Sequence, residues 1–259
     1  MQANPPEWII HSGSLQAEST GRHAHEHHQL LLATKGLMLF EDAQKRHVLC
    51  GQNAVFIPGG CMHTAETIGD VVHFASLYFT SDFFEQRATH SPTSLPDAIV
   101  VFQISPLFLM LMEDICGHQD PGELGEPVST TIRLLLLRFL QEKEHILPVS
   151  LPLTPEPRLA KMLTFIDENY HKDLCLEDLE RAFHCSKRTV QRLFKKELYT
   201  SFSGYLRLRR IFEATILLTT TAIPILEVAF RVGYDSLSAF YHAFTTLVGD
   251  TPRKYRLTS

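Results

Sequence analysis

The segment 187–196 concentrates side chains that can bind nucleic acid. It holds five cations and one amide, in the order Lys187, Arg188, Gln191, Arg192, Lys195 and Lys196. An arginine can donate two hydrogen bonds to guanine, a glutamine can pair with adenine in a similar bidentate way, and neighbouring lysines can contact phosphates. The pattern therefore favours a DNA-binding surface, and a solvated face of a helical bundle is the alternative.

Histidines form the second group with chemical potential, and eleven of the fourteen lie within residues 1–154. Two stretches stand out there, GRHAHEHHQLLLATKG at 21–36 and PGGCMH at 58–63. A neutral imidazole binds transition metals through a ring nitrogen, so these stretches suggest a metal site. A pocket for an organic molecule is the other interpretation.

The cations at 187–196 need a helix to present them, and the apolar pattern predicts one. Apolar residues recur at helical spacing from Leu176 to Phe183, a polar break follows at 184–185, and Ser186 is a good cap for a second helix. Two short helices joined by a tight turn, with cations on the second, make a helix-turn-helix unit of the kind that enters a major groove.

The pattern returns about fifty residues later. Pro224 suits the first turn of a helix, and Gly233 can adopt the left-handed conformation that ends it. Ser236 can then cap a further helix with Phe240 on its inner face. Between the two copies, residues 202–219 are expected to form one long helix that holds the modules at a fixed separation.

Residues 158–256 resemble the DNA-binding domain of AraC-type transcription regulators, which has seven helices, two helix-turn-helix units and a linker helix. The matching residues are Ser186, Arg192, Phe194, Tyr205, 209–214, Ile223, Val228, Ala229, Gly233, Tyr234, Ser236, Phe240, Phe244, Gly249, Thr251, Pro252, Tyr255 and Arg256. The resemblance implies a protein that binds double-stranded DNA in a sequence-specific manner.

The resemblance also implies roles for individual residues. In the first module, Arg188, Gln191 and Arg192 would read base edges, and Lys187, Lys195 and Lys196 would contact phosphates. In the second module, the matching positions are Leu237, Ser238, Tyr241 and His242. Family members commonly carry arginine or lysine where this chain has His242, Thr245 and Thr246. We therefore expect a weaker second module that relies on apolar contact with thymine methyl groups. The glycine expected after the first recognition helix is absent, and Tyr199 lies in its region.

The first half of the chain has the pattern of an all-β barrel or sandwich. Between about residues 8 and 80, short apolar runs alternate with glycine and proline, as expected for strands joined by turns. The runs are 30–33, 37–40, 48–49, 54–57 and 71–79, and the expected turn residues include Gly36, Gly51, Pro58 and Gly69.

The two histidine stretches resemble the two motifs of cupins, a barrel domain that AraC-type regulators often carry as a sensor. The resemblance implies metal ligands at His23, His25, Gln29 and His63. In a strand, residues 23 and 25 share a face, so both imidazoles can enter the barrel. Three imidazoles and one oxygen suit Zn or Fe among the transition metals.

Gln29 replaces the carboxylate that cupins usually have at this position, so a metal-free pocket for an organic effector stays open. His27, His28 and Cys61 offer alternative donors. The second candidate function is a metal-dependent cupin enzyme fused to a DNA-binding module. The missing carboxylate disfavours that alternative, and we expect no enzymatic activity.

Two amphipathic helices are predicted at 107–118 and 128–145. They could cap the open end of the barrel, or form the dimer contact that such helices commonly make in AraC-type regulators. We favour a homodimer. The proline-containing stretch 148–157 is expected to be a semi-rigid linker.

The sequence therefore predicts an α+β protein of two domains, a cupin-like sensor and dimerisation domain at 1–147 and an all-α DNA-binding domain at 158–259. The distribution of charge supports this division. Residues 155–259 contain 16 Lys and Arg and 12 Asp and Glu, a net charge of +4. Residues 1–154 contain 8 Lys and Arg and 17 Asp and Glu, a net charge of −9. A basic binding module joined to an acidic sensor is expected to show this asymmetry.

Composition also constrains the compartment. Five cysteines without a C-x-x-C pair favour a reducing cytosol over a disulfide framework. No stretch has the character of a signal peptide or of a membrane span. We expect a cytoplasmic transcription regulator, an activator by resemblance, that responds to a small molecule or a metal.

Overall fold

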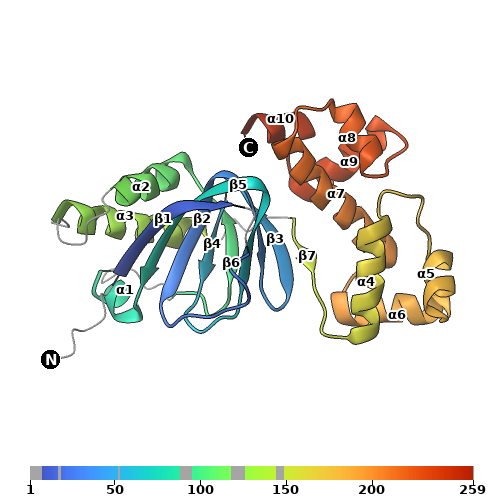
Figure 1. Cartoon of the computed structure of the whole chain (residues 1–259), viewed down its shortest axis with the longest axis horizontal. Helices are drawn as coiled ribbons and strands as arrows, with labels where there is room; N and C mark the ends of the chain where they lie inside the picture. The colour runs from blue at the N-terminus through green and yellow to red at the C-terminus, as the bar shows by residue number, and fades with distance from the viewer. Residues whose placement is uncertain are drawn as a thin grey trace. The chain divides into compact units, whose positions relative to one another are not determined.

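The computed structural model describes residues 8–16, 19–51, 53–87, 95–117, 126–143 and 149–258. The chain divides into two compact units, one of Met1–Asp42 and Val48–Leu147, the other of Ala43–His47 and Pro148–Ser259. Figure 1 shows strands and helices in the first unit and a group of helices in the second. The first residue of the expected linker, 148, lies outside the described ranges.

The first unit is built on antiparallel strands. They are β1 (Trp8–Gln16), β2 (His28–Glu41), β3 (Lys45–Leu49), β4 (Asn53–Ile57), β5 (Thr64–Phe79) and β6 (Val100–Gln103). The order is β1-β5-β2-β3, and β4 pairs with both β2 and β6. A short strand, β7 (Leu151–Pro152), pairs with residues 45–46, the part of β3 that belongs to the second unit. The long strand β2 is therefore the centre of the sheet.

The expected turns at Gly36 and Gly69 are wrong, because each glycine lies inside a long strand. Gly36 has a φ of +83°, and the pairing of β2 with β5 shifts register between Ala33 and Lys35 and again between Lys35 and Leu37, the step that contains this glycine. A Cβ atom at this position would lie 2.6 Å from the carbonyl oxygen of Val71. The glycine therefore permits a bulge with close backbone approach, and the runs 30–33 and 37–40 join into one strand.

Both faces of β2 are buried. Leu30 and Leu32 belong to a core that includes helix side chains, whereas Leu31 and Ala33 belong to a second core on the other face. Helices α2 (Pro106–Gly117) and α3 (Glu126–Glu142) cover the first face (Figure 1).

Aromatic contacts fix this helix layer. The ring of Phe139 in α3 stacks on that of Phe56 in β4, with centroids 4.8 Å apart. Phe108 in α2 meets the edge of Phe102 in β6 at 5.6 Å. The helix pair therefore covers a face of the sheet instead of capping an open end. The predicted ends of these helices at 118 and 145 lie outside the described residues, and the short helix α1 (Ser81–Arg87) was not predicted.

The second unit contains seven helices in its described part. They are α4 (Pro157–Asn169), α5 (Leu176–Phe183), α6 (Lys187–Leu198), α7 (Phe202–Thr220), α8 (Ile225–Arg231), α9 (Leu237–Val248) and α10 (Pro252–Thr258). Serine side chains cap three of them, since Ser186, Ser201 and Ser236 each accept a hydrogen bond from a backbone N–H in the first turn. None of the helices in the described ranges is long and apolar enough to cross a membrane.

Helix α7 joins two cores. Its first half packs with α4, α5 and α6 around Phe194 and Tyr205. Its second half packs with α8 and α9 around Phe240 and Phe244. One continuous helix therefore connects the two helix-turn-helix units, as the sequence predicts.

Tyr199 ends α6 in a left-handed conformation, with φ +54° and ψ +25°. Its side chain is 91% exposed, so packing does not compensate for the strain. This conformation costs a residue with a Cβ atom roughly 1–2 kcal/mol, and glycine adopts it without that cost.

Replacing Tyr199 with glycine is therefore expected to stabilise the helical unit. The net gain in unfolding free energy is about 0.5–1 kcal/mol, because glycine also increases the entropy of the unfolded chain. Calorimetry of the full chain should show a transition about 2–8 °C higher. Tyr199→Ala is the matched control, since it removes the same ring but keeps the strain. An equal rise in both variants would contradict the strain explanation.

Candidate nucleic-acid interface and histidine cluster

Packing of α6 determines which of its side chains face solvent. Val190 and Phe194 are fully buried in the core around α7. Residues on the opposite side of the helix are exposed, and these are Lys187, Arg188, Gln191, Arg192, Lys195 and Lys196. All six residues predicted for the first module therefore lie on one accessible surface, which we call the α6 face.

Two lysines of the α6 face are paired within the protein. Lys187 donates to the carboxylate of Glu177 in α5, and Lys196 donates to Glu197 at 2.8 Å. The hydrogen bond from Lys187 lowers the pKa of Glu177 to about 2. By contrast, Arg188, Arg192 and Lys195 have no hydrogen bond or ion pair with the described residues, so these cations are available to a ligand.

The second recognition helix, α9, presents an uncharged surface. Leu237, Ser238 and His242 are exposed. Tyr241 is half-buried, and its ring meets the edge of Phe240 with centroids 6.3 Å apart. The helix contains no lysine or arginine, so its contribution to DNA binding would depend on shape, hydroxyl groups and apolar contact.

Two of the three arginines of α7, Arg209 and Arg210, hold the unit together through contacts within the protein. Arg209 donates to Asp167 of α4 at 2.8 Å, and its guanidinium lies 4.2 Å from the ring centroid of Tyr170. Arg210 donates to the carbonyl oxygens of Tyr170 and Lys172. These contacts tie α4 and the segment after it to the linker helix.

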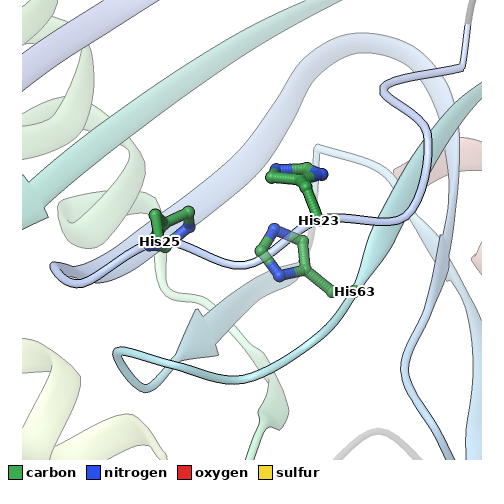
Figure 2. A group of neighbouring side chains, drawn as sticks. All are labelled: His23, His25 and His63. Atoms are coloured by element: carbon green, nitrogen blue, oxygen red, sulfur yellow. The ribbon is translucent and has the colours of Figure 1, made fainter.

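In the first unit, His23, His25 and His63 form a cluster (Figure 2). Each histidine contributes one ring nitrogen to the cluster, and these three nitrogens lie within 4.8 Å of one another. The ring centroids of His23 and His63 are 4.4 Å apart, and those of His25 and His63 are 5.2 Å apart. Three of the four ligands implied by the cupin resemblance therefore meet, although His63 is distant in sequence.

The route by which they meet differs from the prediction. Residues 23 and 25 were expected to share the face of a strand, but both precede β2 in a non-strand segment. His23 instead makes an isolated bridge with His63, in which each backbone N–H donates to the carbonyl oxygen of the other residue at 3.0 and 2.9 Å. Backbone pairing between two loops assembles the cluster.

Each imidazole is anchored at Nδ1 by a backbone carbonyl. The acceptors are Gly21 for His23 at 3.0 Å, His27 for His25 at 2.7 Å and Cys61 for His63 at 3.0 Å. A carbonyl oxygen only accepts, so Nδ1 carries the proton in all three rings, and Nε2 holds the lone pair of the neutral form. The acceptors come from the backbone, so no side-chain motif in the sequence could have revealed them.

Gln29, the fourth predicted ligand, lies beside His25 with its Oε1 atom 2.9 Å from Nε2. Its amide nitrogen donates to the hydroxyls of Ser76 at 2.7 Å and Tyr78 at 2.9 Å. Gln29 and Ser76 are buried, so the amide is held in place. Ser76 and Tyr78 were not predicted as site residues, and only the pairing of β2 with β5 places them here.

The other candidate donors lie outside the cluster. His28 accepts from the backbone N–H of Gly59 and makes a hydrogen bond to Ser81, so both of its ring nitrogens are engaged. Burial raises the pKa of the Cys61 thiol, which disfavours a metal-binding thiolate. Within the cluster, burial lowers the pKa of His63, and the neighbouring histidines lower it further, which favours the neutral ring.

The two units together have the features of a ligand-binding domain followed by a DNA-binding domain with two helix-turn-helix units. Residues 6–137, about half of the chain, match the AraC-like ligand binding domain, and residues 179–258 match a helix-turn-helix domain family. The chain belongs to the AraC family of transcription regulators.

Several relatives align with the chain. YkgA of Escherichia coli strain K12 is 33% identical over 98 residues, which are 38% of this chain and 41% of YkgA. The virulence regulon transcriptional activator VirF of Yersinia enterocolitica is 30% identical over 64% of this chain and 62% of its own length. The HTH-type transcriptional regulator NimR of Escherichia coli strain K12 is 27% identical over 97% of this chain and 88% of its own. The chain thus spans less than two thirds of YkgA and VirF.

The ion pair between Glu177 and Lys187 leads to a prediction for the affinity of the protein for DNA. Glu177→Gln should free Lys187 for a phosphate contact and increase affinity for all DNA sequences. The slope of log affinity against log salt should steepen by about 0.9, as expected for one added phosphate contact. Fluorescence anisotropy over a salt series measures both quantities. Glu168→Gln on α4 changes the net charge equally, and a slope change of the same size in that control would contradict the release of Lys187.

Proposed function

We propose that this chain is a one-component, sequence-specific regulator of transcription that binds double-stranded DNA through both helix-turn-helix units. The observation that supports this function best is the α6 face, where Arg188, Gln191 and Arg192 are exposed without a partner among the described residues. These side chains read base edges, Lys195 and Lys196 contact phosphates, and Lys187 joins them when its ion pair with Glu177 opens.

The two recognition helices enter successive major grooves, which are about 34 Å apart along one face of the duplex. Helix α7 sets this spacing because it packs into the cores of both modules. The second module contacts DNA through Leu237, Ser238, Tyr241 and His242. Since α9 carries no lysine or arginine, most of the electrostatic affinity comes from the first module.

The sensor domain comprises residues 1–147, and the linker 148–157 joins it to the DNA-binding domain at 158–259. The effector, a small molecule or a metal ion, binds at His23, His25, Gln29 and His63. It acts by binding more tightly to the DNA-competent arrangement than to the incompetent one. The protein acts in the cytoplasm, by binding and without catalysing a reaction. VirF is named an activator, which supports activation as the outcome.

We further propose that two copies associate through α2 and α3. Leu107 and Met110 of α2 and Leu134 of α3 are 49%, 65% and 48% exposed, which is a large exposure for apolar side chains. Such apolar groups are typical of a surface that another copy covers.

The proposed base contacts can be tested on sites selected from random-sequence duplexes. Arg192→Ala should reduce the preference for selected over random DNA by roughly 5- to 150-fold, the equivalent of one bidentate base contact. Lys195→Ala is the matched control on the same face. It should weaken binding to both DNAs equally and flatten the salt slope by about 0.9. Unchanged preference in Arg192→Ala would refute the assignment of this residue.

The dimer can be tested by sedimentation velocity of the full chain. Met110→Glu places a charge on the most exposed of the three apolar residues, so it should shift the protein from dimer to monomer. Val71→Glu changes another exposed apolar residue, on β5, and should leave the dimer intact. A monomeric wild-type chain, or a dimer that withstands Met110→Glu, would contradict this interface.

A further inference from the structure

The anchoring of the three imidazoles restricts what they can bind. Because Nδ1 of His23, His25 and His63 each donates to a backbone carbonyl, the neutral rings present only the lone pair of Nε2 to a ligand. Three lone pairs cannot donate hydrogen bonds to a carboxylate or phosphate. A metal cation, which accepts electron pairs, is a complementary ligand, and a group that donates hydrogen bonds is the other kind.

The same arrangement is typical of metal-binding histidines. Such residues usually donate their other ring nitrogen to a carbonyl or carboxylate, which fixes the tautomer and the orientation of the ring. Ligands of tetrahedral zinc are roughly 3.3 Å apart, given Zn–N distances of about 2.0–2.1 Å. One ring nitrogen from each of the three histidines lies within 4.8 Å of the other two, so side-chain rotation and modest movement can bring the rings to that separation.

Gln29 adds a second indication. With Nδ1 protonated, the Nε2 lone pair of a neutral His25 faces Oε1 of Gln29 at 2.9 Å, and two acceptors at this distance repel each other. A metal ion between them removes the conflict, since neighbouring ligands at a right angle about 2.1 Å from a metal are roughly 3.0 Å apart. Hydrogen bonds to Ser76 and Tyr78 hold the amide group of Gln29 beside His25.

We propose that His23, His25 and His63 bind one divalent transition metal ion of the class of Zn(II) through Nε2, with Gln29 as an additional oxygen ligand, and that this ion is the effector. The role as effector rests on the function proposed above, whereas metal binding does not. Three neutral imidazoles leave a coordination position for water or for a second molecule.

Metal binding is tested first, on the untagged full chain after treatment with a chelator. Equilibrium dialysis against ZnSO4 with elemental analysis should give one equivalent of zinc, and Co(II) should produce the visible absorption of a nitrogen-ligated site. His23→Ala and His63→Ala should each lower affinity by more than the roughly 10- to 100-fold that loss of an outer-shell partner costs. His73→Ala, which removes an exposed imidazole elsewhere on β5, is the control and should bind as wild type.

Gln29→Glu provides a gain-of-affinity test that loss of folding cannot imitate. The hydroxyls of Ser76 and Tyr78 can donate to a carboxylate as well as accept from an amide, so the substitution fits the same contacts. A carboxylate is a stronger ligand for zinc than an amide, and affinity should rise by about tenfold or more. No rise in this variant, or equal zinc binding by wild type and His63→Ala, would overturn the metal site.

Regulation is measured separately, as affinity for selected and random duplexes with and without ZnSO4. A zinc-dependent change in the wild type that is absent in His63→Ala supports the ion as the effector. Stoichiometric zinc without any effect on DNA binding would overturn that role and leave the metal site intact. Absence of sequence-specific DNA binding under both conditions would refute the proposed function and not the metal site.

Discussion

The packing of α6 against α7 is the interaction on which the DNA-binding surface depends. Phe194 meets the edge of Tyr205 with ring centroids 5.9 Å apart, and Val190 is buried beside them. Burial of an aromatic side chain of this size is worth about 3–5 kcal/mol, far more than an exposed ion pair. Since helical geometry fixes the angle between side chains, anchoring Val190 and Phe194 also determines that Arg188 and Arg192 point outward.

The two helix-turn-helix units share this construction but differ in electrostatics. Both recognition helices begin at a serine cap, and both bury three residues in a core that they share with α7. The α6 face carries five cations, whereas α9 carries none. This difference in charge suits a protein whose first module contacts phosphates and donates hydrogen bonds to bases. The second module then contributes through its shape complementarity and apolar contacts.

The first unit combines an apolar core with a small polar site, and backbone groups make that combination stable. Buried polar side chains cost free energy unless they are hydrogen-bonded. Gln29 satisfies this requirement through Ser76 and Tyr78, and each clustered histidine does so through a carbonyl oxygen. The same bonds that satisfy the side chains also hold them in one orientation, so the cluster is preorganised for a ligand.

The sequence by itself determined the helices of the second unit, because their signals are local. Apolar spacing and the caps at Ser186 and Ser236 depend on residues within one or two turns, and even the strain at Tyr199 could be anticipated from the missing glycine. The residues of the α6 face follow from the same local pattern, because the apolar stripe of a helix also defines its solvent-facing side.

Only the tertiary structure decided the features that depend on distant pairing. Glycine with a positive φ suits both a turn and a bulge, and the register of β2 against β5 selects the bulge at Gly36. Likewise, the motifs indicated His23, His25 and His63, but their meeting depends on backbone bonds between two loops. The proton on each Nδ1 is fixed by a backbone carbonyl group. Every residue carries such a carbonyl, and only the fold brings the right one to each ring.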